Sequence, residues 1–163
     1  MTVANMKDVI KRFGNVQALD HVSFEIQEGE VLGLLGPNGA GKTTAIRALA
    51  GLIGSDSGEI MLFGEKQEVN NIRLKQHLGL ITQEVTVFEE LTAEENLRFF
   101  GGLYGVKGDK LRQRVKETLE FVGLSEHSKK APGKFSGGMQ RRLNIACALV
   151  HSPKLLFGAV DAS

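Results

Sequence analysis

A glycine-rich loop near the N-terminus constrains the fold of this chain most. It reads Gly-Pro-Asn-Gly-Ala-Gly-Lys-Thr over residues 36–43 and directly follows an uninterrupted apolar run at residues 31–35. The apolar run predicts a strand that is buried on both faces of a parallel sheet, and residues 42–50 predict a helix. A strand, a glycine loop and a helix in this order are typical of a loop that binds phosphate groups. We therefore predict an α/β fold.

The chemistry of the loop follows from its residue types. Glycines allow consecutive backbone N–H groups to point at phosphate oxygens, and the N-terminus of the following helix adds a partial positive charge. Lys42 would reach the β- and γ-phosphates of a nucleotide, and the Thr43 hydroxyl would help to hold Mg²⁺. The alternative is a chance glycine-rich turn. By itself the loop does not separate kinases, GTPases, helicases and transport ATPases.

A second glycine motif lies far downstream and reads Ser-Gly-Gly-Met-Gln over residues 136–140. A serine and two glycines at the start of a helix form a second anion site, with a hydroxyl and bare N–H groups facing outward. The alternative is an ordinary serine cap whose glycines permit close packing. Two anion sites in one chain suggest a nucleotide held between two subunits, each of which supplies one of the sites.

Periodicity places the remaining elements. Short strands are predicted at residues 22–26, 57–64, 78–82 and 155–157. Thr92 and Glu95 form a capping box that starts a helix, and an apolar stripe at helical spacing marks a second helix through Leu111, Val115, Leu119 and Val122. A third helix is predicted from Ser136 to about residue 150.

Composition excludes several classes of protein. The 163 residues carry a net charge of +1, which argues against a nucleic-acid binder. The one cysteine, Cys147, lies in an apolar helical run and is predicted to be a small buried hydrophobic residue. No apolar run reaches the roughly 20 residues of a membrane span, and no export signal is visible.

Between about residues 6 and 157, the chain resembles the ATP-binding subunit of an ABC transporter. Residues 135–142 resemble the family's signature sequence, with phenylalanine where leucine is common. Gln83 resembles the Q-loop glutamine, which in the family contacts Mg²⁺ and the attacking water. Phe13 stands where the family has an aromatic residue that stacks on adenine. Residues 87–97 are similar to exporters of the drug, antibiotic and sodium efflux type.

The resemblance implies a P-loop NTPase core with an N-terminal antiparallel β subdomain and an α-helical signature subdomain, the C-terminal core strands being missing. Within one partial ATP-binding domain, residues 1–30 would form the β subdomain, 31–83 the P-loop core, 84–150 the helical subdomain and 151–163 a remnant of the acidic-strand region. It implies ATP and Mg²⁺ as cofactors. The partners would be membrane subunits and a second ATP-binding subunit, as a homodimer or heterodimer, with no nucleic acid. The location would be cytoplasmic, at the cytoplasmic face of the membrane.

The expected site residues fall into three sets. ATP would be bound by Phe13, Gly36, Pro37, Asn38, Gly39, Ala40, Gly41, Lys42, Thr43, Thr44 and Gln83. The metal would be held by Thr43 and Gln83. The partner subunit's ATP would be contacted by Ser136, Gly137, Gly138 and Gln140.

The resemblance fails where catalysis should begin. The family has an acidic pair after the strand that follows the signature helix: one acid holds Mg²⁺ through water, and the other polarises the attacking water. In this chain those positions are Ala159 and Val160, and Asp161 stands about 6.6 Å beyond the expected metal acid. We therefore expect no catalytic residue, and a C-terminally truncated or frameshifted sequence.

Three interpretations remain open. The first is an export ATPase subunit that binds MgATP and hydrolyses it poorly. The second is a non-catalytic nucleotide-binding module that pairs with an intact homologue. The third is a phosphotransferase or GTPase, which the serine-glycine cap disfavours.

Overall fold

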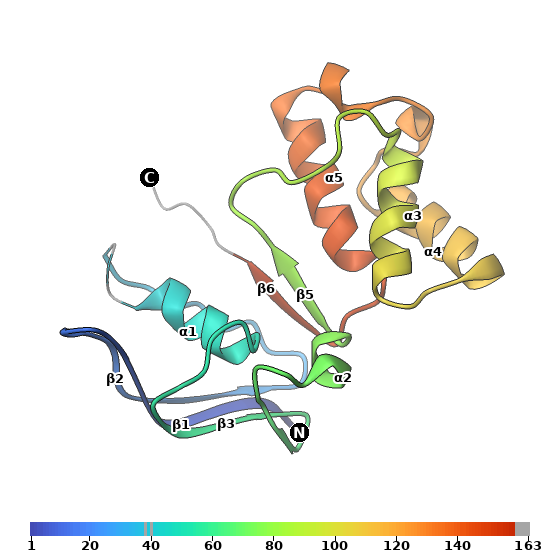
Figure 1. Cartoon of the computed structure of the whole chain (residues 1–163). Helices are drawn as coiled ribbons and strands as arrows, with labels where there is room; N and C mark the ends of the chain where they lie inside the picture. The colour runs from blue at the N-terminus through green and yellow to red at the C-terminus, as the bar shows by residue number, and fades with distance from the viewer. Residues whose placement is uncertain (38, 40, 159–163) are drawn as a thin grey trace. The chain divides into compact units, whose positions relative to one another are not determined.

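The computed structural model describes residues 1–37, 39 and 41–158. Strands and helices are mixed along the chain (Figure 1). The strands are β1 Thr2–Phe13, β2 Val16–Gln27, β3 Ser57–Leu62, β4 Glu65–Lys66, β5 Leu78–Ile81 and β6 Leu155–Gly158. The helices are α1 Lys42–Leu49, α2 Ile72–Lys75, α3 Ala93–Leu103, α4 Gly108–Phe121 and α5 Gly137–Leu149, with 3₁₀ turns η1 Ser125–His127 and η2 Pro132–Lys134.

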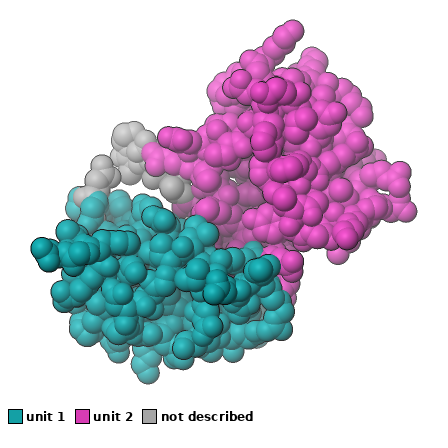
Figure 2. All heavy atoms as spheres, viewed as in Figure 1, with its two compact units in different colours: residues 1–75 teal, residues 76–163 magenta. Residues whose placement is uncertain are grey.

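The described residues divide into two compact units, residues 1–75 and the remainder from residue 76 (Figure 2). The phosphate-loop motif belongs to the first unit and the signature motif to the second. We describe each unit by itself.

The first unit is built on an antiparallel sheet in the order β2-β1-β3-β4. Strands β1 and β2 form a hairpin in which Phe13 pairs with Val16 across a two-residue turn. Strand β1 also pairs with β3, so the sheet takes strands from both sides of α1 in the sequence. Met6, Val9 and Leu62 are fully buried. Burial of these side chains holds the sheet together.

The sequence predicted a strand at residues 31–35, and this prediction is wrong. These residues carry no helix or strand, and the side chains of Val31 and Leu35 are 97% and 94% exposed. A strand needs neighbours to satisfy its backbone N–H and C=O groups. Over the described ranges, the one parallel ladder joins β5 to β6, and no strand pairs with residues 31–35. Apolar composition alone therefore did not decide the structure of this segment.

The second unit combines the parallel pair β5 and β6 with three helices, α3, α4 and α5 (Figure 1). Its core gathers the predicted stripe of α4 with Leu97 of α3, Leu143 of α5, and Leu124 and Val150, which lie just outside the helices; these four are fully buried. Burial of Val115 and Leu119 confirms the helical period that the sequence predicted.

Local signals placed several elements correctly. The capping box is formed: the Glu95 backbone N–H donates to Thr92 Oγ1 at 3.2 Å, and the Thr92 N–H donates to the Glu95 carboxylate at 2.8 Å. Helix α5 begins directly after Ser136, as predicted. Strands β3, β5 and β6 lie within one or two residues of their expected bounds.

Candidate functional site

The phosphate loop is shaped by glycines with left-handed backbone angles. Gly39 has φ +85° and Gly41 has φ +91°. At Gly41 a Cβ atom would lie 2.4 Å from the carbonyl oxygen of Ala18, a distance that real Cβ atoms do not adopt. Only glycine fits this position, because both the backbone angle and the neighbouring strand exclude a side chain.

Helix α1 starts immediately after Gly41, which provides no side-chain cap for it. Its first N–H groups have no acceptor within the helix, which leaves them available to an external acceptor. Lys42 is the first helical residue, and its ammonium group donates a hydrogen bond to the Gly36 carbonyl. This bond closes the loop on itself. Thr43, the proposed metal ligand, is exposed in the same turn beside the half-buried Thr44.

The other residues predicted to bind ATP are mostly exposed or lie outside the described residues. Gly36 and Pro37 are exposed, while Asn38 and Ala40 lie outside the described residues. Phe13 ends β1 with 48% of its surface exposed, and the Lys11 ammonium lies 5.3 Å from the centre of its ring. An exposed aromatic face with a cation beside it is compatible with stacking on a base.

The signature motif forms the N-terminus of α5. Ser136 is the N-cap, and its Oγ accepts a hydrogen bond from the Met139 N–H at 3.2 Å. Gly137 and Gly138 are exposed, and a Cβ atom on either would meet open space. Gln140 turns the other way, since its Nε2 donates to the Pro132 carbonyl at 2.9 Å. The cap and the two glycines therefore present the outward-facing surface of this motif.

Gln83 lies two residues after β5, in the irregular segment 82–92 that leads to α3. Its carbonyl accepts a hydrogen bond from Arg141 Nη1 of α5 at 3.1 Å, and the same nitrogen donates to the Thr82 carbonyl at 2.5 Å. The predicted Q-loop residue and the signature helix are thus joined directly.

Two buried asparagines hold this segment, and the sequence analysis missed both. Asn144, 5% exposed, bonds to Thr82 and Thr86. Asn96, fully buried, bonds to Phe88, Leu91 and Thr92. A polar residue at an apolar position of a helical pattern was the available signal, because such residues are normally hydrogen-bonded. Arg142 of α5 donates from Nη1 to the Val122 carbonyl at 3.1 Å.

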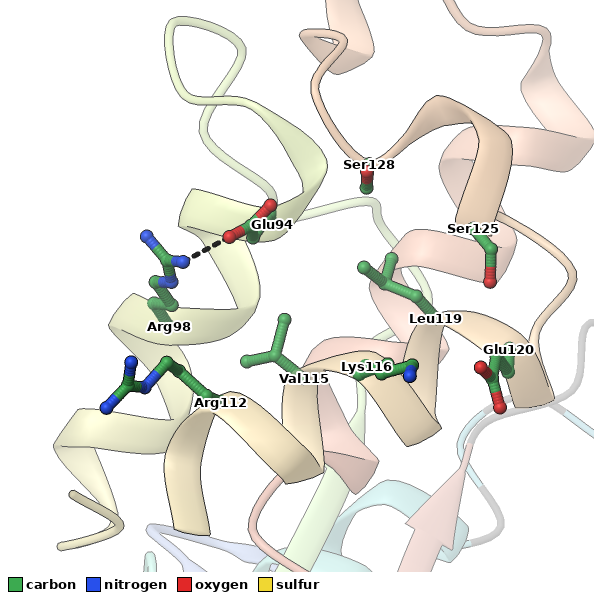
Figure 3. A pocket seen from close by; sticks show the side chains of 9 residues that line it. All are labelled: Glu94, Arg98, Arg112, Val115, Lys116, Leu119, Glu120, Ser125 and Ser128. Atoms are coloured by element: carbon green, nitrogen blue, oxygen red, sulfur yellow. Dashed lines mark hydrogen bonds and ion pairs between the residues drawn. The ribbon is translucent and has the colours of Figure 1, made fainter. Parts of the chain in front are cut away.

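A cavity of about 380 Å³ lies between α3 and α4 in the second unit (Figure 3). Val115 and Leu119 line it with charged side chains, among them the ion-paired Glu94 and Arg98. A hydrogen bond from Lys129 lowers the pKa of the Glu94 carboxyl, which keeps that group ionised. None of the predicted site residues lines this cavity.

Burial confirms the expectation for Cys147, which is a free thiol in the core of the second unit. Desolvation raises the pKa of this thiol to about 12, so it stays neutral and unreactive near pH 7.

Two further searches concern only the residues that the structure describes. Within them, no group of histidine, cysteine or acidic side chains is arranged to hold a metal ion. None of their helices combines the length and the apolar character that crossing a membrane requires. The two positions where the resemblance expects catalytic acids, Ala159 and Val160, lie outside the described residues, as does Asp161.

The mixed α/β fold, with a glycine loop leading into α1, defines a P-loop nucleotide-binding protein. Comparison with known proteins narrows this class. The sequence model of the ABC transporter family matches residues 19–158. The chain therefore belongs to the ABC transporter family, which confirms the resemblance that the two glycine motifs indicated.

Individual relatives give the scale of the similarity. The chain is 43% identical over 150 residues to the linearmycin resistance ATP-binding protein LnrL of Bacillus subtilis, covering 92% of this chain and 48% of that protein. It is 41% identical over 155 residues to the bacitracin transport ATP-binding protein BcrA of Bacillus licheniformis, covering 95% and 50%. The chain spans about half the length of these two relatives.

A solved structure shares the fold. The ADP conformation of MJ1267, an ATP-binding cassette of an ABC transporter, superposes with a TM-score of 0.85 at 26% identity. The match covers 96% of this chain and 67% of that structure.

Proposed function

We propose that this chain binds MgATP through the loop at residues 36–43. The observation that carries the proposal is the glycine geometry before α1: Gly41 adopts an angle and a position that only glycine allows. Such a loop aims backbone N–H groups at an anion, and Lys42 and Thr43 follow at the positions that favour phosphate and Mg²⁺. Phe13 is proposed to stack on the base and Gln83 to contact the metal ion. When bound, Mg²⁺ neutralises phosphate charge.

The second part of the proposal concerns assembly. The serine cap and exposed glycines of α5 form a second anion site, which we assign to the ATP of a partner subunit. Two such chains, or one chain and a homologue, would then share two nucleotides. Membrane subunits would supply the path for the transported substrate, and they would hold this chain at the cytoplasmic face of the membrane.

The direction of transport is proposed from two observations. Residues 87–97 resemble exporters, and LnrL and BcrA are named for linearmycin resistance and bacitracin transport. We propose that the assembled transporter exports its substrate.

Hydrolysis is proposed to be weak in this chain. The positions where the family places the metal-binding acid and the general base are Ala159 and Val160, and neither side chain can accept a proton. The proposed state is therefore an ATP-binding subunit with poor turnover. The alternative is a non-catalytic module whose signature motif completes the site of an intact homologue.

Titration calorimetry with MgATP tests the binding site. We expect submillimolar affinity, and a loss of about tenfold or more in Lys42→Ala, because a charged hydrogen-bond donor to phosphate is removed. Lys107→Ala is the matched control, since Lys107 is an exposed lysine at the N-terminus of α4 without a glycine loop. Equal affinity in wild type and Lys42→Ala would refute the proposed site.

Phosphate release tests turnover. We expect at most trace release from the pure chain, and efficient magnesium-dependent hydrolysis would overturn the proposed deficiency. Mixing the chain with an intact homologous subunit tests the alternative. Activity in the mixture that disappears with Ser136→Ala would favour the non-catalytic module.

A further inference from the structure

The segment that contains Gln83 is irregular, so its position depends on side chains from elsewhere. Strand β5 ends at Ile81 and α3 begins at Ala93. Residues 82–92 between them form no helix or strand. Backbone groups in such a segment need other hydrogen-bond partners, and those partners fix where the segment lies.

Two residues of α5 supply these partners on both sides of Gln83. Arg141 donates from Nη1 to the carbonyls of Thr82 and Gln83, at 2.5 and 3.1 Å. Asn144, one turn further along the helix, donates from Nδ2 to the Thr82 carbonyl at 3.3 Å. Its Oδ1 accepts from the Thr86 backbone N–H at 3.2 Å and from the Thr86 hydroxyl at 3.3 Å. Gln83 is thus bracketed by bonds to a single helix.

A local hydrogen bond also stabilises the backbone around Gln83. The Thr82 hydroxyl donates to the Glu84 carbonyl at 2.6 Å, and Asn144 Nδ2 also lies 3.4 Å from that hydroxyl oxygen. Asn144 is 5% exposed, so its bonds form away from competing water. Buried side-chain amides of this kind specify one backbone arrangement, because any other arrangement leaves their polar atoms unpaired.

The other half of the segment has a separate support. Asn96 of α3 accepts from the Phe88 N–H at 2.8 Å, and its Nδ2 lies within 3.2 Å of the Phe88, Leu91 and Thr92 carbonyls. Residues 82–86 are therefore held by α5 and residues 88–92 by α3. The first group contains Gln83 and the second does not.

We propose that Arg141 and Asn144 are positioning residues, which fix Gln83 relative to the signature helix and thereby set how Mg²⁺ contributes to ATP binding. The inference rests on the proposed function, in which Gln83 contacts the metal ion. Helix α5 begins at the Ser136 cap, which the proposed function assigns to the partner's nucleotide. A displacement of this helix would then move the Gln83 backbone through Arg141 and Asn144, which links the two nucleotide sites of the assembly.

The first test needs no nucleotide. Amide hydrogen exchange followed by NMR compares the full chain with Asn144→Ala and with Asn96→Ala as the matched control. We expect the Thr86 amide to exchange faster only in Asn144→Ala, and the Phe88 amide only in Asn96→Ala. An unchanged Thr86 amide in Asn144→Ala would overturn the proposal, because the segment would then not depend on this side chain.

The second test measures the affinity for ATP in the presence of Mg²⁺ and in the presence of EDTA. The readout is the affinity with Mg²⁺ divided by the affinity with EDTA. A loss of fold would lower both affinities, whereas a displaced Gln83 lowers the ratio. We expect the ratio to fall about tenfold in Arg141→Ala, Asn144→Ala and Gln83→Ala, the scale typical of outer-shell residues at metal sites. Adding Gln83→Ala to either variant should cause no further loss, and Asn96→Ala should keep the wild-type ratio.

The outcomes separate the two proposals. A wild-type chain whose ATP affinity is independent of Mg²⁺ would overturn the role of Gln83 and this inference together. A second outcome would overturn this inference alone. In it, Gln83→Ala lowers the affinity ratio, whereas Arg141→Ala and Asn144→Ala keep the wild-type ratio. If Asn144→Ala does not fold, Arg141→Ala decides, since Arg141 is only half-buried. Partial recovery in Arg141→Lys, which keeps a positively charged donor group, is expected.

Discussion

The two irregular segments that carry predicted site residues are held in different ways. Residues 31–37 lead into the phosphate loop with exposed apolar side chains and no ladder partner among the described strands. Residues 82–92 carry Gln83 and are bonded at both ends by buried asparagines. The first segment leads into a loop that depends on the backbone geometry of Gly39 and Gly41, and the second segment depends on side chains from neighbouring helices. Substitutions should therefore act on the first through strain and on the second through unpaired polar groups.

The largest expected effect is in the phosphate loop to which the first segment leads. Gly41→Ala places a Cβ atom 2.4 Å from the Ala18 carbonyl at φ +91°. A left-handed angle costs a non-glycine residue about 1–2 kcal/mol, and the steric overlap adds about 1–3 kcal/mol. We expect the free energy of unfolding, measured with urea, to fall by the sum of these two costs. Affinity for MgATP should fall with it.

Gly39→Ala separates the two costs. Gly39 has a similar angle, φ +85°, but open space where a Cβ atom would lie. This variant should show only the loss of about 1–2 kcal/mol that the angle causes. Equal stability of the two variants would show that the contact with Ala18 is not important.

The next effect compares the two asparagines. Asn96→Ala removes the side-chain donor to three carbonyls and the acceptor of the Phe88 N–H, so we expect a loss of about 2–3 kcal/mol in the free energy of unfolding. Asn144→Ala should cost less, about 1–2 kcal/mol, because its bonds are longer, at 3.2–3.4 Å. Urea unfolding followed by circular dichroism measures both. A larger loss in Asn144→Ala would contradict this ranking.

A smaller effect distinguishes the two helix caps. Thr92 and Glu95 bond reciprocally, whereas Ser136 makes a single cap bond. Thr92→Ala should lower the free energy of unfolding by about 1 kcal/mol and Ser136→Ala by about 0.5 kcal/mol. Thr92→Ser keeps the hydroxyl and serves as the control. Both variants lose one hydroxyl acceptor and keep their backbone N–H groups, so equal costs would indicate that the reciprocal Glu95 bond does not strengthen the Thr92 cap.

The smallest effect is a pH dependence of the second unit. His151 stacks on Tyr104 with ring centres 3.7 Å apart, and its Nε2 donates to the Leu78 carbonyl at 2.8 Å. Burial lowers the pKa of His151 below its ordinary value of 6.5, and Arg114 and His77 add to this shift. The unfolded chain therefore binds this proton more readily than the folded chain. Stability should fall as the pH falls below 6.5 toward the lowered pKa.

Unfolding in urea at several pH values between 5 and 7.5 measures this dependence. Glu94 does not interfere there, because its pKa lies below 4.5. His151→Gln retains a donor for the Leu78 carbonyl without titrating, so its slope over this range should be shallower. A slope identical to that of the wild type would exclude His151 as the source.

Local signals explain how much could be predicted from the sequence. The Thr92 capping box, the Ser136 cap and the stripe on α4 are set by neighbours within four residues, and all three are formed. The strand at residues 31–35 required partners that a local pattern does not specify, and that prediction was wrong. The contacts of Asn144 and Arg141 were not predicted, for a related reason. Their acceptors lie about 60 residues away in the sequence, at Thr82 and Gln83.

The pairing of β5 with β6 has a consequence for the order of folding. Leu78 pairs with Leu155, and α3, α4 and α5 all lie between them in the sequence. On a ribosome, β5 would emerge before β6 and remain unpaired, while the helices between these two strands form from short-range contacts. Closing so long a loop is slower than local helix formation. The ladder between β5 and β6 should therefore be the last part of the second unit to form. Until it forms, the unpaired strand β5 should make the nascent chain prone to aggregation.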